Sequence, residues 1–248
     1  MAARSQKPDS ANGLVKVLRV LMKHAVKLGM RGDDPTTGIT LLQPKSKTGF
    51  HRWTEPEIAQ FEAHHPVGST ARLALALGLF SAQARQDVIA MGPQHIRDEV
   101  LHWVRKKTEH TTAIELAIPI HADLRAIINV TPSGHLTFLV TEFGKPFTAA
   151  GFGNWFRDQC NRAGLRHCSF HGLRKAAASR LAEAGATVHE IAAITGHATL
   201  KEIDRYTKTA DRKRLAAAAM AKLKGEHPVS NLTPRFDNSD KKSKQIKS

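Results

Sequence analysis

The segment HGLRKAAASRLAEAGATVHEIAAITGHATLKEIDRYTK, residues 171–208, decides the fold, because its helix boundaries follow one another at short intervals. Gly185 is typical of a helix end, since glycine accepts the left-handed backbone that commonly closes a helix. Thr187 and Glu190 form a capping box, in which each side chain accepts a hydrogen bond from the other residue's backbone N–H. The segment therefore predicts one helix that ends near Gly185 and another that starts after Thr187.

Tyr206 is the only tyrosine of the 248-residue chain. Thr199 and Glu202 form a further capping box, which follows a turn expected at Gly196 and His197. Tyr206 is therefore expected late on a short helix that begins after this turn.

The side chains of residues 171–208 suit the transfer of a phosphoryl group. The phenol of Tyr206 can attack a phosphodiester and hold it covalently. The planar guanidinium of Arg174 can donate two hydrogen bonds to one phosphate, while His171 and His197 can donate to the same phosphate or move protons. An H-x-x-R match by itself is expected about once by chance in a chain with 14 histidines. The order and spacing of the four residues support the prediction.

The composition favours a nucleic-acid partner. The formal net charge is +15 and the pI about 10.2, and cationic side chains bind DNA by displacing its condensed counterions. The same charge also fits RNA or an anionic membrane surface. No apolar run is long enough to span a membrane, and residues 1–6 do not resemble a signal peptide. We therefore expect a soluble, intracellular protein.

The two cysteines, Cys160 and Cys168, suit a reducing compartment and are expected to pack as small apolar residues. The alternative is a zinc site formed by Cys160, Cys168, His167 and His171, although their spacing matches no common ligand pattern. We expect no metal site.

An amphipathic helix is predicted over residues 10–28, with Ser10 as its N-cap and Gly29 as the residue that ends it. Leucines recur at helical spacing on one side, and four cations share the other side: Lys16, Arg19, Lys23 and Lys27. These cations either form a solvated basic face or contact DNA. Residues 33–50 are rich in turn formers and lysine, which predicts a linker.

A second domain is expected to begin near His51. Thr54 and Glu57 form a capping box for its first helix, and residues 72–91 are predicted to form two helices with a bend near Ser81. Two β-branched and aromatic runs joined by a polar stretch predict a β-hairpin, over residues 100–108 and 113–120. The expected fold class is mostly α with a small antiparallel β-sheet (α+β).

The ordered residues His171, Arg174, His197 and Tyr206, with the helix breaks between them, resemble the catalytic domain of the tyrosine recombinase, or phage integrase, family. The resemblance extends over about residues 10–220. It implies the tyrosine recombinase catalytic-domain fold for most of the chain.

Three regions are expected. By the resemblance, residues 1–50 would be the end of a helical N-terminal core-binding domain and its linker, and residues 51–225 the catalytic domain. An apolar face predicts a helix at residues 211–224, and the polar, lysine-containing composition of residues 226–248 predicts a mobile basic tail. Members of this family clamp the duplex between the two domains, which favours DNA contact for the basic helix. The earlier helices of the N-terminal domain would then be missing.

The implied activity is site-specific DNA recombination or integration. Tyr206 would attack the scissile phosphate to leave a 3′-phosphotyrosyl link, and a 5′ hydroxyl of the partner strand would reverse the reaction. His171, Arg174 and His197 would surround the phosphate. No cofactor is implied, because the covalent link conserves the phosphodiester energy.

The family's β-hairpin lysine corresponds to Lys107, which stands before Thr108. In the family this lysine enters the minor groove and protonates the leaving 5′ oxygen. Adjacent strand residues face opposite ways, so Lys106 and Lys107 cannot both do this from a regular strand. Lys106 is then left as a DNA-binding candidate.

The implied partner is double-stranded DNA, with a homotetramer that exchanges two duplexes and with an accessory DNA-bending or directionality factor. No membrane partner is expected. The expected location is the cytoplasm of a bacterium, in a protein of bacterial or phage origin that associates with the nucleoid when bound to DNA.

The position of the first catalytic arginine departs from the family pattern. That pattern resembles G-x-R-x-x-[ED] followed by apolar residues, and the matching segment here is AQARQDV, residues 82–88. Ala84 falls at the arginine position, because the register is fixed by four residues: Asp87, Val88, Met91 and Ile96. Arg85 is the candidate substitute. A regular helix would displace it by about 100°, although a π-bulge or a non-helical turn would redirect it.

Two functions of different class follow. The first is an active DNA strand-transferring recombinase of a mobile genetic element, in which Arg85 compensates for Ala84. The second is a catalytically decayed integrase that acts as a non-enzymatic DNA-binding protein, which Ala84 and the short N-terminus favour. A metalloenzyme that uses the many histidines lacks suitable ligand spacing.

Overall fold

The structure is a computed structural model that describes residues 7–43, 49–106 and 113–197, together with 199–201, 203–204, 206–208, 212, 216–217 and 219–221. The chain divides into two compact units, an N-terminal unit, Met1–His51, and a C-terminal unit, Arg52–Ser248. Within the described ranges, no helix combines the length and the apolar character needed to cross a membrane.

The N-terminal unit consists of helix α1 (Pro8–Lys27) and the segment that follows it. The expected N-cap, Ser10, is wrong, because the helix starts at Pro8 with Lys7 as its N-cap. Proline fits the first helical turn, where its missing N–H costs no hydrogen bond. The expected helix end is confirmed, since Gly29 follows with φ of +69°.

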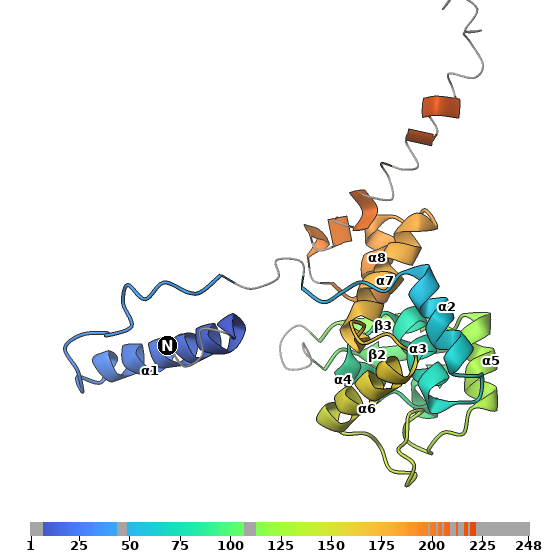
Figure 1. The fold of residues 1–248 in the computed structure, drawn as a ribbon, viewed down its shortest axis with the longest axis horizontal. Coiled ribbons are helices and arrows are strands. Elements are labelled where there is room, and N and C mark those ends of the chain that lie inside the picture. Colours follow the sequence, from blue (N-terminus) through green and yellow to red (C-terminus); the bar gives the residue numbers. More distant parts are fainter. Residues whose placement is uncertain are drawn as a thin grey trace, which may run out of the picture. The chain divides into compact units, whose positions relative to one another are not determined.

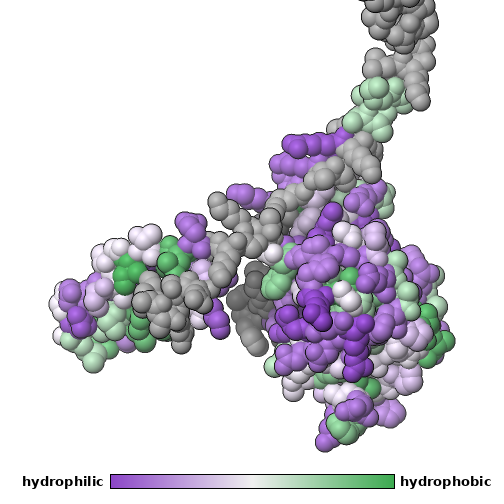
Figure 2. Space-filling view, in the orientation of Figure 1, coloured by the Kyte–Doolittle hydropathy of each residue, from purple (hydrophilic) through white to green (hydrophobic). Residues whose placement is uncertain are grey.

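The first part of the expected linker packs along α1. The amide of Asn12 donates to the Leu42 carbonyl at 2.7 Å and accepts from the Leu42 N–H at 2.8 Å. Arg19 donates to the Ile39 carbonyl. The leucine side of α1 is exposed within this unit, and apolar side chains lie at its surface in Figure 2.

The C-terminal unit contains the remaining elements in chain order (Figure 1): α2 (Glu55–His64), α3 (Thr70–Ser81), α4 (Arg85–Val88), the 3₁₀ helix η2 (Pro93–His95), β1 (Ile96–Arg97), β2 (Val100–Val104), β3 (Glu115–Pro119), α5 (Ala122–Val130), α6 (Ala149–Arg162), α7 (Phe170–Glu183) and α8 (Val188–Thr195).

Helix α3 is the centre of this unit, because it is apolar on nearly every side and packs against α7 and α5. Leu73 and Leu77 of α3 are buried together with Val88 and Met91. The predicted bend near Ser81 is also confirmed, because α3 ends there.

Aromatic rings form the part of the core between α2, α6 and α7. Phe61 and Phe156 are fully buried with their ring centroids 5.5 Å apart, and Phe156 meets Phe170 at 5.1 Å. Trp53 donates from its indole N–H to the Ser169 carbonyl at 2.9 Å. This bond ties the start of α2 to the start of α7.

The sheet has three antiparallel strands in the order β1-β2-β3. Leu101 pairs with Ile118 and Trp103 with Leu116, and these four side chains are buried while their neighbours along the strands are not. This alternation is that of a half-buried strand. The predicted hairpin and the fold class, mostly α with a small antiparallel sheet, are confirmed. The hairpin connection, residues 107–112, lies outside the described residues.

Helices α7 and α8 have the boundaries that the sequence predicts. The Thr187 side chain accepts from the Glu190 N–H at 3.2 Å, and the Glu190 carboxylate accepts from the Thr187 N–H at 2.6 Å, so this capping box is confirmed. Gly185 follows α7 with φ of +93°. Glu202 of the second capping box, most of residues 211–224 and the tail at 226–248 lie outside the described residues.

Candidate active site

The loop between α3 and α4 contains the position where the family pattern has its first arginine. Ala82 has a left-handed backbone with φ of 54°, and Ala84 is an extended N-cap with φ of −72° and ψ of 158°. The backbone here is therefore a non-helical turn. Arg174 of α7 donates from Nη1 to the Ala82 carbonyl at 2.7 Å, which places its guanidinium at this loop.

Arg85 is the first residue of α4, and its side chain runs to α6. A Cβ built on Gly153 would lie 2.1 Å from Arg85 Nη1, so the guanidinium occupies space that only glycine leaves open. Partial burial, followed by the positive charge of Arg85, lowers the pKa of His171. The guanidinium of Arg85 therefore lies against α6, and its charge acts on His171.

His197 follows α8 at the turn that Gly196 makes with φ of 65° and ψ of 33°. Burial, followed by the charges of Arg174 and Arg105, lowers the pKa of His197 to about 4. Its imidazole is therefore neutral at neutral pH. The charge of Arg174, which lies on α7, therefore acts on His197 at this turn.

Arg105 is a residue of this site that the sequence analysis missed. It lies directly after β2, is buried and donates from Nη1 to the Gly196 carbonyl. Leu101 and Trp103 are buried on the same strand. Strand alternation therefore places Arg105 on the inward face, and this signal could have found it.

Two further buried polar residues join the elements of the site. The Gln83 amide donates to the Ser81 and Ile194 carbonyls, each at 2.8 Å, and so links the α3–α4 loop to the end of α8. Asp87 accepts from the Trp103 indole N–H at 3.2 Å and from the Lys106 N–H at 2.9 Å. The loop, the hairpin base and the His197 turn are thus held by side chains that touch across the fold.

Tyr206 lies on the helical segment after the His197 turn, where the described residues 200–201, 203–204 and 206–208 have helical backbone. Its ring is half-buried and packs beside α7, the helix that also carries His171 and Arg174. The ring contacts a small apolar cluster: Ala178, Ala182, Ile191 and Ile203.

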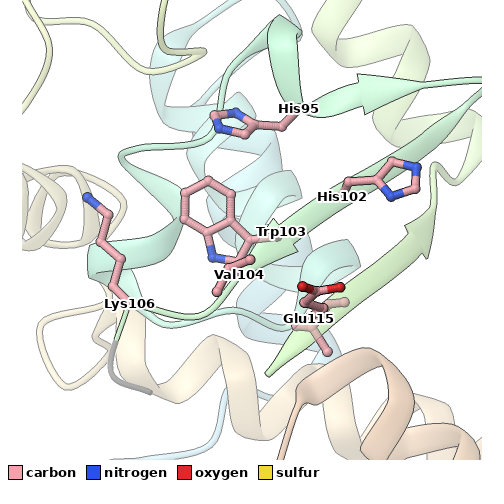
Figure 3. Close-up of a pocket in the computed structure, with 7 residues that line it drawn as sticks. His95, His102, Trp103, Val104, Lys106 and Glu115 are labelled. Carbon is pink, nitrogen blue, oxygen red and sulfur yellow. The ribbon is translucent and has the colours of Figure 1, made fainter. Parts of the chain in front are cut away.

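Lys106 lies at a cavity of about 320 Å³ beside the hairpin, and Lys107 lies outside the described residues. Figure 3 shows Lys106, His95 and Trp103 around this cavity, with the His95 and Trp103 ring centroids 4.9 Å apart. Neither Arg174 nor the other described candidate catalytic residues line it. The cavity is a neighbour of the site.

The four cations of α1 differ in their surroundings. Lys16, Lys23 and Lys27 are exposed, whereas Arg19 is half-buried and bonded to the Ile39 carbonyl. Three of the four candidate DNA-binding cations of α1 therefore face solvent within their unit.

The cysteines are buried, and burial raises the pKa of each thiol to about 12. Both are therefore neutral thiols in the core at neutral pH. Atoms of Glu57, His167 and Cys168 that could bind a metal lie within 4.8 Å of one another. Two residues of the zinc alternative, Cys160 and His171, are not in this group. In that set, His167 Nε2 and Glu57 Oε1 already pair at 2.5 Å.

We expect the free energy of unfolding to fall as the pH drops from about 6.5 toward 4. Burial lowers the pKa of His65, His171 and His197, so the unfolded chain binds protons that the folded chain does not. The free energy of unfolding has its full value above the pKa of histidine in the unfolded chain, near 6.5. As the pH falls, this free energy decreases until His197 is protonated in the folded chain, near pH 4. Urea unfolding at several pH values measures this. His197→Gln should flatten the dependence, and an unchanged slope in that variant would contradict the assignment.

The sequence model of the Phage integrase family matches residues 55–213, and the chain belongs to this family. A segment of 136 residues is 32% identical to the shufflon-specific DNA recombinase of Escherichia coli and covers 53% of this chain and 33% of that relative. The chain therefore spans about a third of the length of that relative.

The fold is similar to that of solved integrases. A lambda integrase dimer bound to a COC′ core site matches with a TM-score of 0.69 and 20% identity, over 82% of this chain and 74% of that chain. A lambda integrase tetramer bound to a Holliday junction matches with a TM-score of 0.66 and 20% identity, over 78% of this chain and 60% of that chain. The expected tyrosine recombinase catalytic-domain fold is confirmed.

Proposed function

We propose that this protein is a site-specific DNA recombinase that breaks and rejoins strands through a 3′-phosphotyrosyl link to Tyr206. The observation that supports this best is the group of arginines whose charges reach the two histidines. Arg85 acts on His171, and Arg174 and Arg105 act on His197. Such a concentration of cations suits a group with negative charge, as a scissile phosphate has. The related recombinase and integrases described above act on or bind DNA.

In the proposed reaction the Tyr206 oxygen bonds to phosphorus while the bond from phosphorus to the 5′ oxygen breaks. Arg174 and His171 contact the phosphate oxygens, where guanidinium groups stabilise the charge that develops in the transition state. Lys107 gives a proton to the leaving 5′ oxygen. The partner strand's 5′ hydroxyl then displaces Tyr206 and restores a phosphodiester.

Arg85 takes the part of the arginine that is absent at Ala84. The support is its side-chain path, since the guanidinium lies against Gly153 and influences His171. A guanidinium that approaches from α4 can reach the phosphate region without an arginine at position 84.

The proposed partner is duplex DNA, with four copies of the chain on two duplexes, as the lambda integrase tetramer on a Holliday junction suggests. The exposed lysines of α1 and Lys106 would contact phosphates. We further propose that the reaction needs no cofactor or metal and takes place in the cytoplasm of a bacterium, with an accessory DNA-bending or directionality factor.

The second candidate is a catalytically decayed integrase that binds DNA without cutting it. Ala84 favours it, because a phosphate-clamping arginine contributes about 10³ to 10⁵ in rate in related phosphoryl-transfer chemistry. The two candidates differ in one product, the covalent DNA adduct.

A pool of nicked suicide duplexes with a randomised core separates the two candidates. Cleavage beside the nick releases a short fragment that carries the leaving 5′ hydroxyl. Because this fragment diffuses away, religation is prevented, and an active recombinase accumulates a covalent adduct that survives a denaturing gel. Sequencing the trapped DNA then gives the target site, and peptide mapping gives the linked residue. Binding to the pool without any adduct would contradict the recombinase and favour the decayed form.

DNA binding is expected to weaken steeply with added salt. Most contacts should join lysines and arginines to phosphates, and the logarithm of the affinity should fall against log salt by about 0.9 per phosphate contact. Filter binding at several salt concentrations measures the slope. Removing three charges, as Lys16→Gln, Lys23→Gln and Lys27→Gln, should reduce it, whereas a flat response in the unaltered chain would contradict DNA binding.

A further inference from the structure

The end of α8 contains a hydrogen-bond chain that starts at a buried hydroxyl. Thr195 is fully buried, and its Oγ1 donates to the Ile191 carbonyl at 2.7 Å. A carbonyl oxygen can only accept, and a threonine hydroxyl has one proton. The proton of Thr195 is therefore committed to Ile191.

The second partner of this hydroxyl is His197, whose Nδ1 lies 2.7 Å from Thr195 Oγ1. Because Thr195 has no further proton to give, the hydrogen bond requires that Nδ1 carries a proton and donates it. A neutral imidazole has a proton on one nitrogen only. His197 is then the Nδ1–H tautomer, with a lone pair on Nε2.

The charged groups around His197 keep it in this neutral form. Arg174 approaches from α7, and Arg105 approaches from the end of β2. Both are cations that oppose protonation, and burial acts in the same direction. From β3, the element also in contact with this turn, the side chain near Gly196 is the apolar Leu116.

The glycine before His197 is part of the arrangement. A Cβ built on Gly196 would lie 2.7 Å from Arg105 Cδ. The backbone of Gly196 has a φ of 65°, which residues other than glycine adopt only rarely. The turn therefore admits the arginine side chain close to the imidazole.

We propose that Thr195 is a positioning residue that fixes His197 as the Nδ1–H tautomer, so that His197 accepts a proton through Nε2. The inference rests on the proposed function, because the proton would come from the Tyr206 phenol. As that proton moves to Nε2, the phenol oxygen bonds to phosphorus, the bond to the 5′ oxygen breaks and Lys107 protonates the leaving oxygen. A histidine that instead donated to the phosphate from Nε2 would need the other tautomer or a second proton.

Nitrogen-15 NMR of the full chain without DNA tests the tautomer directly. With ¹⁵N-labelled histidine and His197→Gln to assign the signal, the two ring nitrogens of His197 should show a protonated Nδ1 and an unprotonated Nε2 from pH 7 down to about pH 5. Thr195→Ser keeps the hydroxyl and should keep this pattern. Thr195→Val is close in shape but has no acceptor, so the proton should shift to Nε2. A protonated Nε2 in the unaltered chain, or no change in Thr195→Val, would overturn the proposal.

The rate of adduct formation supplies a second readout. General acid–base catalysis contributes about 10² to 10⁴ in rate, so Thr195→Val should slow adduct formation by at least about tenfold, while Thr195→Ser stays near the original rate. Equal rates for all three proteins would overturn the proton-accepting role. If the unaltered chain shows the Nδ1–H tautomer but forms no adduct, the recombinase function fails, while the assignment of Thr195 and its tautomer is supported.

Discussion

We expect Tyr206→Phe to abolish the covalent DNA adduct while DNA affinity stays nearly unchanged. The substitution removes the hydroxyl that attacks phosphorus, and no other described side chain is proposed to replace it. The ring that packs against the α7–α8 cluster is retained, so the fold should be unaffected. Affinity should persist because phosphate contacts come from many lysines and arginines. The measurements are a denaturing gel for the adduct and filter binding for affinity.

Tyr206→Leu is the matched control for packing. It keeps an apolar side chain against Ala178 and Ile203 but loses the aromatic ring. Both variants should lack the adduct and unfold at similar denaturant concentrations. An adduct that survives in Tyr206→Phe would reject the tyrosine mechanism, whatever the affinities are.

Arg85→Ala is expected to lower the rate of adduct formation by about 10³ to 10⁵, the range for loss of a phosphate-clamping arginine. The reason is that the negative charge on the phosphate in the transition state would no longer be stabilised by Arg85, the proposed substitute for an arginine at position 84. Single-turnover adduct formation on the trapped duplex measures the rate. Circular dichroism then shows whether the half-buried side chain was needed for folding.

Gly153→Ala is a sharper version of the same test, because it leaves Arg85 in the chain. The added methyl group would meet the flexible end of Arg85 and displace the guanidinium from its place on α6. We expect a large loss of rate with little loss of stability. Gly151→Ala on the same helix is the control for an added methyl group that does not meet Arg85. Its Cβ would lie 3.0 Å from Thr148 Oγ1, the N-cap oxygen of α6, so the stability of this variant is measured as well.

Ala84→Arg, which restores the family pattern, should raise the rate of the unaltered chain and rescue Arg85→Ala. The added guanidinium would stabilise charge that is present only in the transition state. If Ala84→Arg changes nothing while Arg85→Ala abolishes the adduct, Arg85 is the clamp and Ala84 does not occupy the arginine position. If Arg85→Ala has no effect, Arg85 is not a substitute.

Local sequence determined the elements of this protein, because caps, breaks and periodicity act between residues a few positions apart. Thr187 with Glu190 starts α8, Gly185 follows α7, and alternation along residues 100–104 and 115–119 gives the hairpin. The order of His171, Arg174, His197 and Tyr206 in the sequence likewise indicates the family. Local reasoning was wrong at Ser10, where Pro8 offers an equally good helix start.

The tertiary structure alone decided which cations act on which histidines. Arg105 reaches the Gly196 carbonyl, and Gln83 reaches Ile194, across about ninety and more than a hundred residues of sequence. No local sequence pattern predicts such contacts, because they depend on how α8, the hairpin and the α3–α4 loop pack against one another. The same holds for Arg85, which a regular helix would have displaced by about 100° from the position of Ala84. A non-helical turn that begins at the left-handed Ala82 precedes Arg85, and the Arg85 guanidinium lies against Gly153 of α6.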